Sequence, residues 1–425
     1  MIENWTKADP IARAAMLARP ERREDAAMIE RVRTIVEEVR SEGWPALCRL
    51  AEAIDGAPPQ YVEVAPYADE ALDTLGKDAI DAITLARKNI SAFHRASLPS
   101  DTRIDNDGVQ LTKRWLPLDS AGLYIPGGKA PLFSTLLMLA VPATIAGVRQ
   151  LTVVTPPRPD GGLDPAVALS AELCGIQGIW TVGGAQAIAA LAFGAGEIQP
   201  VDRICGPGNA WVAAAKAMVS AMPGGPGIDL PAGPSELMVI ADAEADPTTV
   251  AADLLSQAEH DLDAQALLVT TAPDLASRVG EEIARQSKAM GGDYAPVRML
   301  GCDTLEEAVA IANAYAPEHL SLALADDEAE RIALRIRNAG TVFVGRAAAE
   351  TFGDYLAGPS HVLPTDRAAR FTGGITTLSF MKAVGFQRVS SEAARRFAAP
   401  AATLARLEGL EAHARAAEAR AGATS

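Results

Sequence analysis

Short apolar runs alternate with amphipathic stretches through most of the chain. Runs rich in branched and aromatic side chains predict buried strands, and stretches such as "PAVALSAELCG" and "TLEEAVAIANAY" have the apolar spacing of helices. The expected strands are Gln150–Pro156, Gly178–Gly184, Glu236–Asp242, Gln265–Thr271 and Gly340–Gly345. Strands that alternate with helices predict parallel sheets covered by helices on both faces. We therefore expect an α/β fold built from doubly wound sheets.

The 425-residue chain is too long for one ordinary core and suits two or three sub-domains. Proline and glycine cluster at residues 156–162 and 222–234, and the second cluster is a candidate sub-domain boundary. After about Gly385 the strand signals stop, and the sequence is typical of helices apart from Pro400. Alanine and charged residues dominate this last segment. We expect a C-terminal helical arm that packs on something else, such as a second copy of the chain.

The formal charge is −16, which repels phosphate backbones and anionic lipid surfaces, so we expect neither nucleic acid nor membrane as a partner. The most apolar stretch, "PLFSTLLMLAVPATIAGV", contains Ser134, Thr135 and Pro142, and it predicts a buried helix rather than a membrane span. The N-terminus lacks the apolar core of a signal peptide.

The cysteines are far apart and form no C-x-x-C pair, which argues against a zinc-finger or thioredoxin-type site. They are Cys48, Cys174, Cys205 and Cys302. Widely spaced cysteines suit reduced thiols, so a cytoplasmic location is expected.

The chain has five histidines, and most lie near carboxylates. His94 stands on a helix with the pattern of a surface element, and we expect it to be solvated. In "APEHL", Glu318 comes directly before His319. A carboxylate beside an imidazole selects its tautomer and raises its basicity, so this pair is a candidate for chemistry.

Metal ligands are a second possibility. Gln257 and His260 lie three residues apart near the end of a helix that is expected to open at Pro247, so they share one face. That spacing suits one metal ion, although an ordinary polar helix end has the same pattern. Asp354 and His361 lie in a glycine- and proline-rich loop after the last expected strand, where ligands often bind, but Asp354 also suits a turn or cap.

Near the C-terminus, "EGLEAHA" carries Glu408 and His413 on a helix with a surface-like pattern. Earlier in the chain, three glycine-rich turns each lie between a strand-like run and a helix-like one: "GLYIPGGKA", "TVGGAQAIA" and "RICGPGNAW". No complete G-x-G-x-x-G or G-x-x-x-x-G-K-[ST] occurs. Such turns place backbone N–H groups against a pyrophosphate, or they serve only as tight connections.

Taken in order, these blocks closely resemble the L-histidinol dehydrogenases, from about Trp115 to the C-terminus. The resemblance implies two incomplete Rossmann-like domains with small helical segments at both ends. The implied division is residues 1–21, a helical segment; 22–122 with 235–375, the first α/β domain, with metal and catalytic residues; 123–234, the NAD-binding α/β domain; and 376–425, the C-terminal helical arm. Trp44 and Pro45 stand where the family has glycine and aspartate, and Ser360 stands where asparagine is usual.

The resemblance also implies roles for individual residues. The catalytic pair is Glu318 and His319. The implied zinc ligands are Gln257, His260 and Asp354, with His413 of the partner subunit as the fourth. The implied substrate-binding residues are Ser235, Gln257, His260, His319, Asp354, Glu408 and His413. The implied NAD contacts are Tyr124, Gln186 and Asn209, one from each glycine-rich turn, and His361 is expected to touch substrate or support the site.

The implied reaction is the four-electron oxidation of L-histidinol to L-histidine through histidinal, with NAD and one Zn²⁺ per subunit, in a cytoplasmic intertwined homodimer. His319 would take the hydroxyl proton, and Glu318 would activate the water that attacks the aldehyde. One alternative is a relative that oxidises another small alcohol, such as a sulfonated diol. A zinc hydrolase and a non-catalytic metabolite-binding protein are two others, and neither predicts NADH formation.

Overall fold

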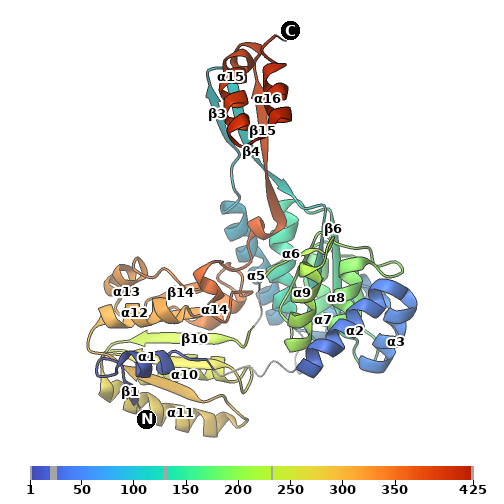
Figure 1. Ribbon diagram of the computed structural model, residues 1–425. Coiled ribbons are helices and arrows are strands. Elements are labelled where there is room, and N and C mark those ends of the chain that lie inside the picture. The colour runs from blue at the N-terminus through green and yellow to red at the C-terminus, as the bar shows by residue number, and fades with distance from the viewer. Residues whose placement is uncertain (1, 20–25, 128–131, 231–232, 423–425) are drawn as a thin grey trace. The chain divides into compact units, whose positions relative to one another are not determined.

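The computed structural model describes residues 2–19, 26–127, 132–230 and 233–422. The helices, strands and 3₁₀ turns run in the order β1 (Ile2–Asn4), α1 (Pro10–Met16), α2 (Ala26–Glu42), α3 (Trp44–Ile54), β2 (Tyr61–Glu63), α4 (Ala65–Thr74), α5 (Lys77–Ala96), β3 (Thr102–Asn106), β4 (Val109–Pro117), β5 (Ser120–Tyr124), α6 (Phe133–Ala146), β6 (Gln150–Thr155), α7 (Pro165–Leu173), β7 (Gly178–Thr181), α8 (Gly184–Phe193), β8 (Arg203–Cys205), α9 (Ala210–Ala221), β9 (Gly227–Ile228), β10 (Glu236–Ala241), α10 (Pro247–Ala258), β11 (Gln265–Thr270), α11 (Pro273–Met290), β12 (Val297–Gly301), α12 (Leu305–Tyr315), β13 (His319–Ala323), α13 (Asp326–Ala333), β14 (Thr341–Val344), α14 (Glu350–Tyr355), η1 (Ala368–Arg370), η2 (Thr377–Phe380), β15 (Met381–Val389), α15 (Ser391–Leu407) and α16 (Glu411–Glu418). All five expected strands are present, and the mixed α/β fold is confirmed (Figure 1).

The first sheet has the strand order β1-β12-β11-β10-β13-β14, and all of its neighbouring strands are parallel. Every residue of β10 is buried. Met238 and Ile240 pack toward α12, whereas Leu237, Val239 and Ala241 pack toward α10 and α11. Helices on both faces explain why this strand is a continuous apolar run in the sequence instead of an alternating one.

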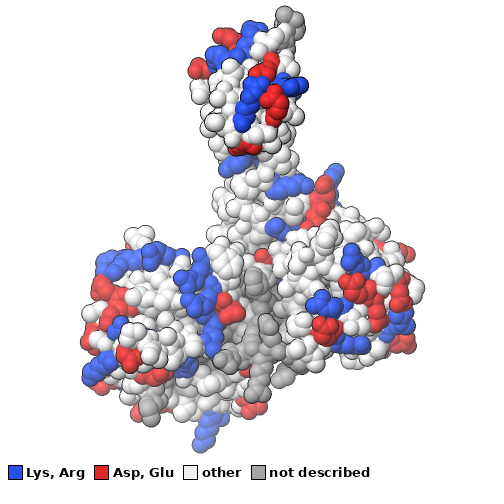
Figure 2. Space-filling model, viewed as in Figure 1, with Lys and Arg blue, Asp and Glu red and all other residues white. Residues whose placement is uncertain are grey.

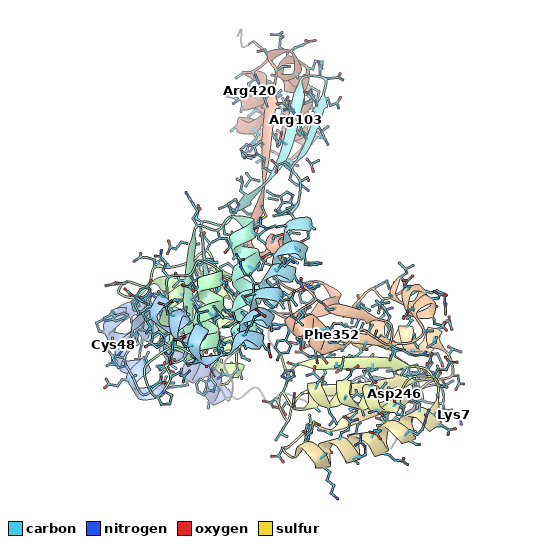
Figure 3. The ribbon with its side chains drawn as sticks, turned by 180° about the vertical axis from the view of Figure 1, so that it is seen from behind. Lys7, Cys48, Arg103, Asp246, Phe352 and Arg420 are labelled. Atoms are coloured by element: carbon cyan, nitrogen blue, oxygen red, sulfur yellow. The ribbon has the colours of Figure 1, made fainter. Side chains whose placement is uncertain are left out.

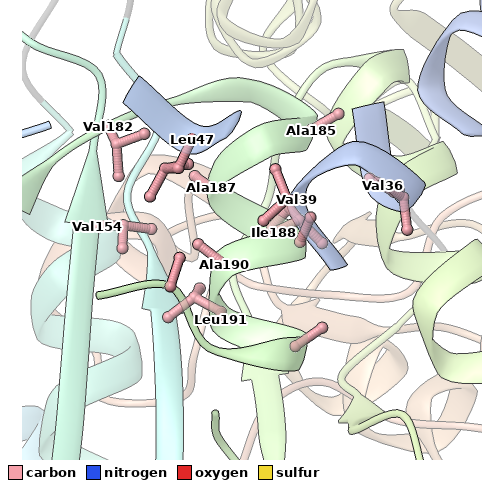
Figure 4. Close-up of a cluster of buried hydrophobic side chains, with 14 of the residues drawn as sticks. Val36, Val39, Leu47, Val154, Val182, Ala185, Ala187, Ile188, Ala190 and Leu191 are labelled. Carbon is pink, nitrogen blue, oxygen red and sulfur yellow. The ribbon is translucent and has the colours of Figure 1, made fainter. Parts of the chain in front are cut away.

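The second sheet has the order β2-β7-β6-β5-β8-β9, parallel except for the edge strand β2. Its helix α8 is buried on almost every side, and its alanines let α2, α3 and α9 approach closely. In Figure 4, Val36, Val39 and Leu47 surround Ala187 and Ile188 of this helix. The strand order reverses between β5 and β8, which is where open α/β sheets bind ligands.

Helices α2 to α5 lie against the second sheet, whereas we expected residues 22–122 in the first domain. Strand β2 pairs with β7, α2 packs on α8 and α9, and α5 packs on α6. The expected N-terminal helical segment contains the helix α1, and it also contains β1, which pairs with β12 and joins the first sheet. An amphipathic pattern identifies a helix but not the sheet it covers, and that choice depends on contacts far apart in the chain.

A separate compact unit contains Leu98–Pro117 and the residues from Met381 onward. Its antiparallel sheet has the order β15-β4-β3, and α15 and α16 pack on each other. We expected a purely helical C-terminal segment, but it also contains the strand β15. Most of β15 is exposed, so the strand has little of the apolar alternation that identifies strands in a sequence. Pro400 lies inside α15, and the helix continues through it.

His94 is fully buried, so our expectation of a solvated histidine was wrong. It shares the buried face of α5 with Ile83, Ala86 and Ile90, three to four residues apart. That spacing is visible in the sequence and was overlooked. Burial lowers the pKa of His94 to about 4. Neither ring nitrogen has a hydrogen-bond partner among the described residues.

Across the described ranges, no helix has both the length and the apolar character that a membrane span needs. Acidic and basic side chains are interspersed on the face shown in Figure 2. All four cysteines are free thiols.

Candidate active site

The residues of the candidate site meet at the amino edge of the first sheet. His319 is the first residue of β13, and its register partner Leu237 lies near the start of β10. Helix α10 runs back from the opposite edge, and Gln257 lies in its last turn. Asp354 lies on the short helix α14, not in the loop at the carboxyl ends of the strands where we expected it. Figure 3 labels Phe352 on this helix.

His319 is buried among oxygen atoms. Its Nδ1 lies 3.3 Å from the carbonyl oxygen of Glu236 and 3.2 Å from Oε1 of Glu350. Oε2 of Glu318 is 3.7 Å from the same nitrogen. Nε2 lies 3.6 Å from Oδ1 of Asp354, too far for a direct hydrogen bond but close enough for charge attraction. Since a carbonyl oxygen only accepts, Nδ1 carries a proton and Nε2 is the nitrogen available for chemistry.

Burial and charge oppose each other at this cluster. Burial lowers the pKa of His319, but Glu318, Glu350 and Asp354 outweigh it and raise that pKa well above its usual range. Burial raises the pKa of the Glu318 carboxyl, against the attraction of His319, and it raises the pKa of Glu350 in the same way. Burial also raises the pKa of Asp354, but the facing His319 outweighs it and leaves the pKa below its usual value. Strongly shifted pKa values in one buried cluster mark a candidate site of proton transfer.

The backbone of Glu236 holds both Glu318 and His319. Its N–H donates to Oε2 of Glu318 at 2.9 Å, and its carbonyl oxygen accepts from His319. The Glu236 side chain forms a two-pronged ion pair with Arg19, in which Nη2 and Oε2 are 2.7 Å apart. The guanidinium also lies over the ring of Tyr315, 4.0 Å from its centroid. The start of β10 is thus anchored where it touches the site.

The environment of Gln257 suits a residue that binds a metal ion. Its side chain is fully buried, and neither amide atom has a hydrogen-bond partner within the described part of the chain. A buried amide without partners is unfavourable unless a further group binds it. His260 lies two residues beyond the end of α10, exposed, and not on the helix as we expected. It is close enough to contribute to the pKa shifts of Asp354 and His361.

Within the described residues, no three His, Cys, Asp or Glu side chains form a group that could hold a metal ion. The expected ligands include an amide and one residue of a second subunit, so a complete set within this chain was not expected. Gln257, Asp354 and His260 supply oxygen and nitrogen donors of the kind that zinc accepts. The residues present therefore fit a zinc ion.

His361 supports the backbone of this region. Its Nδ1 is 2.8 Å from the carbonyl oxygen of Asp354, and its Nε2 is 3.3 Å from Oγ1 of Thr135 on α6. Burial lowers the pKa of His361 and so favours the neutral ring. Ser360 is buried, and its hydroxyl accepts from the N–H of Val362 at 3.1 Å. Ser235 is half-buried, and it is the residue directly before Glu236, where β10 begins.

The described parts of the three glycine-rich turns lie at the carboxyl edge of the second sheet, whereas residues 128–130 of the first turn lie outside the described residues. The Tyr124 hydroxyl accepts from the N–H of Gly184 at 3.2 Å, which joins the first turn to the second. A Cβ on Gly206 would lie 2.1 Å from the carbonyl oxygen of Tyr124, so only glycine fits there and the third turn lies against the first. Asn209 caps α9 and accepts from Trp211 and Val212. Gln186 is buried in the first turn of α8.

Glu408 and His413 belong to the separate C-terminal unit, and both are exposed. Glu408 ends α15, and His413 lies on α16.

Trp44 and Pro45, where the sequence departs from the family pattern, form the first turn of α3. The Trp44 ring packs edge-on against Trp180, with centroids 5.8 Å apart, so this departure has a structural role.

Two residues of the site were missed in the sequence, Glu236 and Glu350. Glu350 is 2 % exposed, and both of its carboxyl oxygens lack hydrogen-bond partners among the described residues. It lies four residues before Asp354 on α14, so the i, i+4 spacing on one helix face was the available signal. Glu236 touches the pair mainly through its main chain, for which the sequence gives no signal.

Comparisons with known proteins identify the family. The profile of the family "Histidinol dehydrogenase" matches residues 17–421. A histidinol dehydrogenase from Gluconobacter oxydans is 42 % identical over 404 residues, which cover 92 % of each chain. One from Legionella pneumophila is 41 % identical over 429 residues, 99 % of this chain and 98 % of the relative. The crystal structure of histidinol dehydrogenase from Elizabethkingia anophelis matches with a TM-score of 0.91 at 35 % identity, over 99 % of this chain and 98 % of that one. The chain belongs to the histidinol dehydrogenase family.

Proposed function

We propose that the protein oxidises L-histidinol to L-histidine through histidinal, the last step of histidine biosynthesis, with two NAD molecules as oxidants. The observation that carries the proposal is the environment of His319. It is a buried imidazole among three carboxylates, in a chain of the histidinol dehydrogenase family that also buries the unpartnered amide of Gln257. An Nε2 without a hydrogen-bond partner among the described residues, together with the buried carboxylate of Glu318, suits both halves of an alcohol-to-acid oxidation.

One Zn²⁺ per subunit would be held by Gln257, His260 and Asp354, together with His413 of the partner subunit. When bound, the ion would fix the amine and imidazole of the substrate and offset the carboxylate charge around His319. The buried, unpartnered amide of Gln257 supports this assignment. Ser235 and Glu408 complete the proposed substrate pocket, and His361 holds the backbone at Asp354.

In the alcohol half-reaction, Nε2 of His319 takes the hydroxyl proton, and NAD, when bound, would accept the hydride of the carbinol carbon. The carbonyl oxygen of Glu236 holds the proton on Nδ1, which keeps Nε2 facing the substrate. Glu350 and Asp354 stabilise the imidazolium that forms. The products of this half are histidinal and one NADH, and the proton passes from His319 to solvent.

In the aldehyde half-reaction, Glu318 takes a proton from a water molecule, and the oxygen of that water adds to the aldehyde carbon. A second NAD, when bound, would accept the hydride of the hydrated carbon, which becomes the carboxyl group of L-histidine. The proton on Glu318 and the proton of the new carboxylic acid pass to solvent. The N–H of Glu236 fixes one oxygen of Glu318 at 2.9 Å, so the other oxygen faces the reaction. The raised pKa of the buried Glu318 carboxyl makes it a stronger base than an exposed carboxylate.

The NAD would lie at the carboxyl edge of the second sheet, in contact with Tyr124, Gln186 and Asn209. The joined turns and the start of α9 support this position.

The C-terminal unit would complete the active site of a partner subunit in an intertwined homodimer. Its helices expose apolar side chains beside Glu408 and His413, which suits a surface that another copy covers. These are Phe397, Leu404, Leu407 and Leu410. Free cysteines suit the proposed cytoplasmic location.

The proposal is tested by substrate choice. Zinc-loaded protein is mixed with NAD and either L-histidinol or a sulfonated diol, and NADH is followed by absorbance. We expect turnover with L-histidinol and little with the diol, because Glu408 and His413 suit a cationic amino-imidazole group. Turnover with the diol alone would favour a relative with another substrate, and no NADH with either would favour a hydrolase or a binding protein.

A further inference from the structure

A carboxylate occupies the helix N-terminus at which a dinucleotide phosphate commonly binds. Asp55, the residue that follows α3, accepts two hydrogen bonds through Oδ2. One comes from the N–H of Gly183 at 3.0 Å and the other from Nε2 of Gln186 at 3.0 Å. Gly183 is the N-cap of α8, and Gln186 lies in the first turn of that helix. The N–H of Gly184 is also engaged, because it donates to the Tyr124 hydroxyl at 3.2 Å. The first two N–H groups of this turn are therefore used by side-chain oxygens.

Asp55 fixes the orientation of the Gln186 amide. A carboxylate only accepts hydrogen bonds, so the nitrogen of the amide faces Asp55 and Oε1 is left as an acceptor. Gln186 is fully buried, and Oε1 has no hydrogen-bond partner among the described residues. A Cβ on Gly184 would lie 2.6 Å from Oε1, so this position keeps room for the oxygen only as glycine. Oε1 of Gln186 is thus a hydrogen-bond acceptor that is held in place and has no donor among the described residues.

The charge of this turn decides what it binds. The Asp55 carboxylate repels a phosphate, and burial raises its pKa because a charged group there is poorly solvated. The oxygens of Asp55, Gln186 and Tyr124 together suit a hydroxyl or an amine. In a dinucleotide, the ribose hydroxyls and the 6-amine of the adenosine half are groups of this kind. The β5-β6-β7 half of the sheet lies on one side of the strand reversal, and in doubly wound folds a half of this topology holds the adenosine.

We infer that Asp55 is a specificity-determining residue of the NAD site. It fixes Gln186 as an acceptor, and the two residues together select a hydrogen-bond donor of the adenosine half and exclude a phosphate from the turn. The inference rests on the proposed use of NAD and adds which part of NAD this turn recognises.

The test uses binding and not turnover. Dissociation constants are measured by titration calorimetry with the full-length, zinc-loaded protein in the absence of substrate. The ligands are NAD and three analogues that each lack one adenosine donor: the 2′-hydroxyl, the 3′-hydroxyl or the 6-amine. One analogue should bind about tenfold more weakly than NAD, because the buried acceptor loses its donor. In Asp55→Asn the difference in dissociation constant between NAD and that analogue should fall below about threefold. The reason is that the Gln186 amide is then free to exchange the positions of its oxygen and nitrogen.

Two further variants make the result specific. Gln186→Met removes the acceptor and should remove the same discrimination, which keeps the test decisive if Asp55→Asn does not fold. Asp202→Asn is the matched control, since Asp202 accepts two backbone N–H groups at the amino edge of the same sheet and should leave the discrimination intact. Equal binding of all four ligands to the unaltered protein, or unchanged discrimination in Asp55→Asn, would overturn the role of Asp55. Absence of any NAD binding would overturn the proposed function as well.

Discussion

Nδ1 of His319 lies 3.2 Å from Oε1 of Glu350, and both side chains are buried. The Glu350 carboxylate favours the protonated imidazole, so it raises the pKa of His319. This contact links a residue that the sequence pattern left unnoticed to the proposed base. It also predicts how the reaction should depend on pH.

Glu350→Gln should move the acidic limb of the rate profile to lower pH. Removal of the negative charge lowers the pKa of His319, so the neutral base is populated at lower pH, by about one unit for a charge at this distance. The measurement is kcat with L-histidinol and NAD between pH 5 and 10, with Glu306→Gln as the control because Glu306 is exposed on α12. A limb that stays in place or moves to higher pH would show that Glu350 does not act on the base.

Glu318→Gln should separate the two half-reactions. The glutamine no longer accepts a proton from water, so oxidation of histidinal should slow by about 100-fold, whereas oxidation of the alcohol should slow much less. Each half is measured by single-turnover NADH formation, starting from L-histidinol or from histidinal. Equal slowing of both halves would mean that Glu318 has no separate role in water activation.

The buried His94 should make the protein less stable in mild acid. Burial holds its pKa at about 4, below the ordinary value of 6.5. The unfolded chain therefore binds a proton first as the pH falls below 6.5, and stability is lost from there down to pH 4. In His94→Leu this component should be absent, so between pH 8 and pH 5 the variant should lose ~2 kcal/mol less unfolding free energy than the unaltered protein.

Urea unfolding at the two pH values measures this difference. Leucine has a similar volume, so the comparison of one variant with itself across pH separates the proton effect from any packing change. An identical pH dependence of the two proteins would mean that His94 gains a proton in the folded state as easily as in the unfolded chain.

The proposed exchange of ligands between subunits predicts complementation. His260→Ala and His413→Ala should each be inactive, because each lacks one zinc ligand. When the two variants are unfolded and refolded together, a mixed dimer contains one site with both histidines, so activity should return to about a quarter of the unaltered level. Refolding each variant alone is the control. No recovery in the mixture would mean that both ligands come from the same subunit.

The sequence predicted the helices and strands better than it predicted which elements pack against one another. The five buried strands and the apolar helix α6 were identified, because both depend on nearby residues. The placement of α2 to α5 on the second sheet was missed, since no local pattern encodes it. Strand β15 was missed because most of its side chains face solvent.

Parts of the candidate site were predictable for a similar reason. Glu318 and His319 stood out as neighbours in a chain with few histidines, and the structure brings Asp354 within 3.6 Å of His319. The contribution of Glu236 comes from its backbone and an ion pair with Arg19, more than 200 residues away in the chain. Contacts of that kind depend on the register of β10 against β13, which only the folded chain defines.

The central claim is that one site carries L-histidinol through both oxidations around His319 and Glu318. The most direct measurement counts NADH per L-histidinol consumed by the zinc-loaded protein while a carbonyl reagent traps any free aldehyde. We predict two NADH for each L-histidinol, with L-histidine as the product and no trapped histidinal. One NADH per L-histidinol, with histidinal captured by the reagent, would contradict the account.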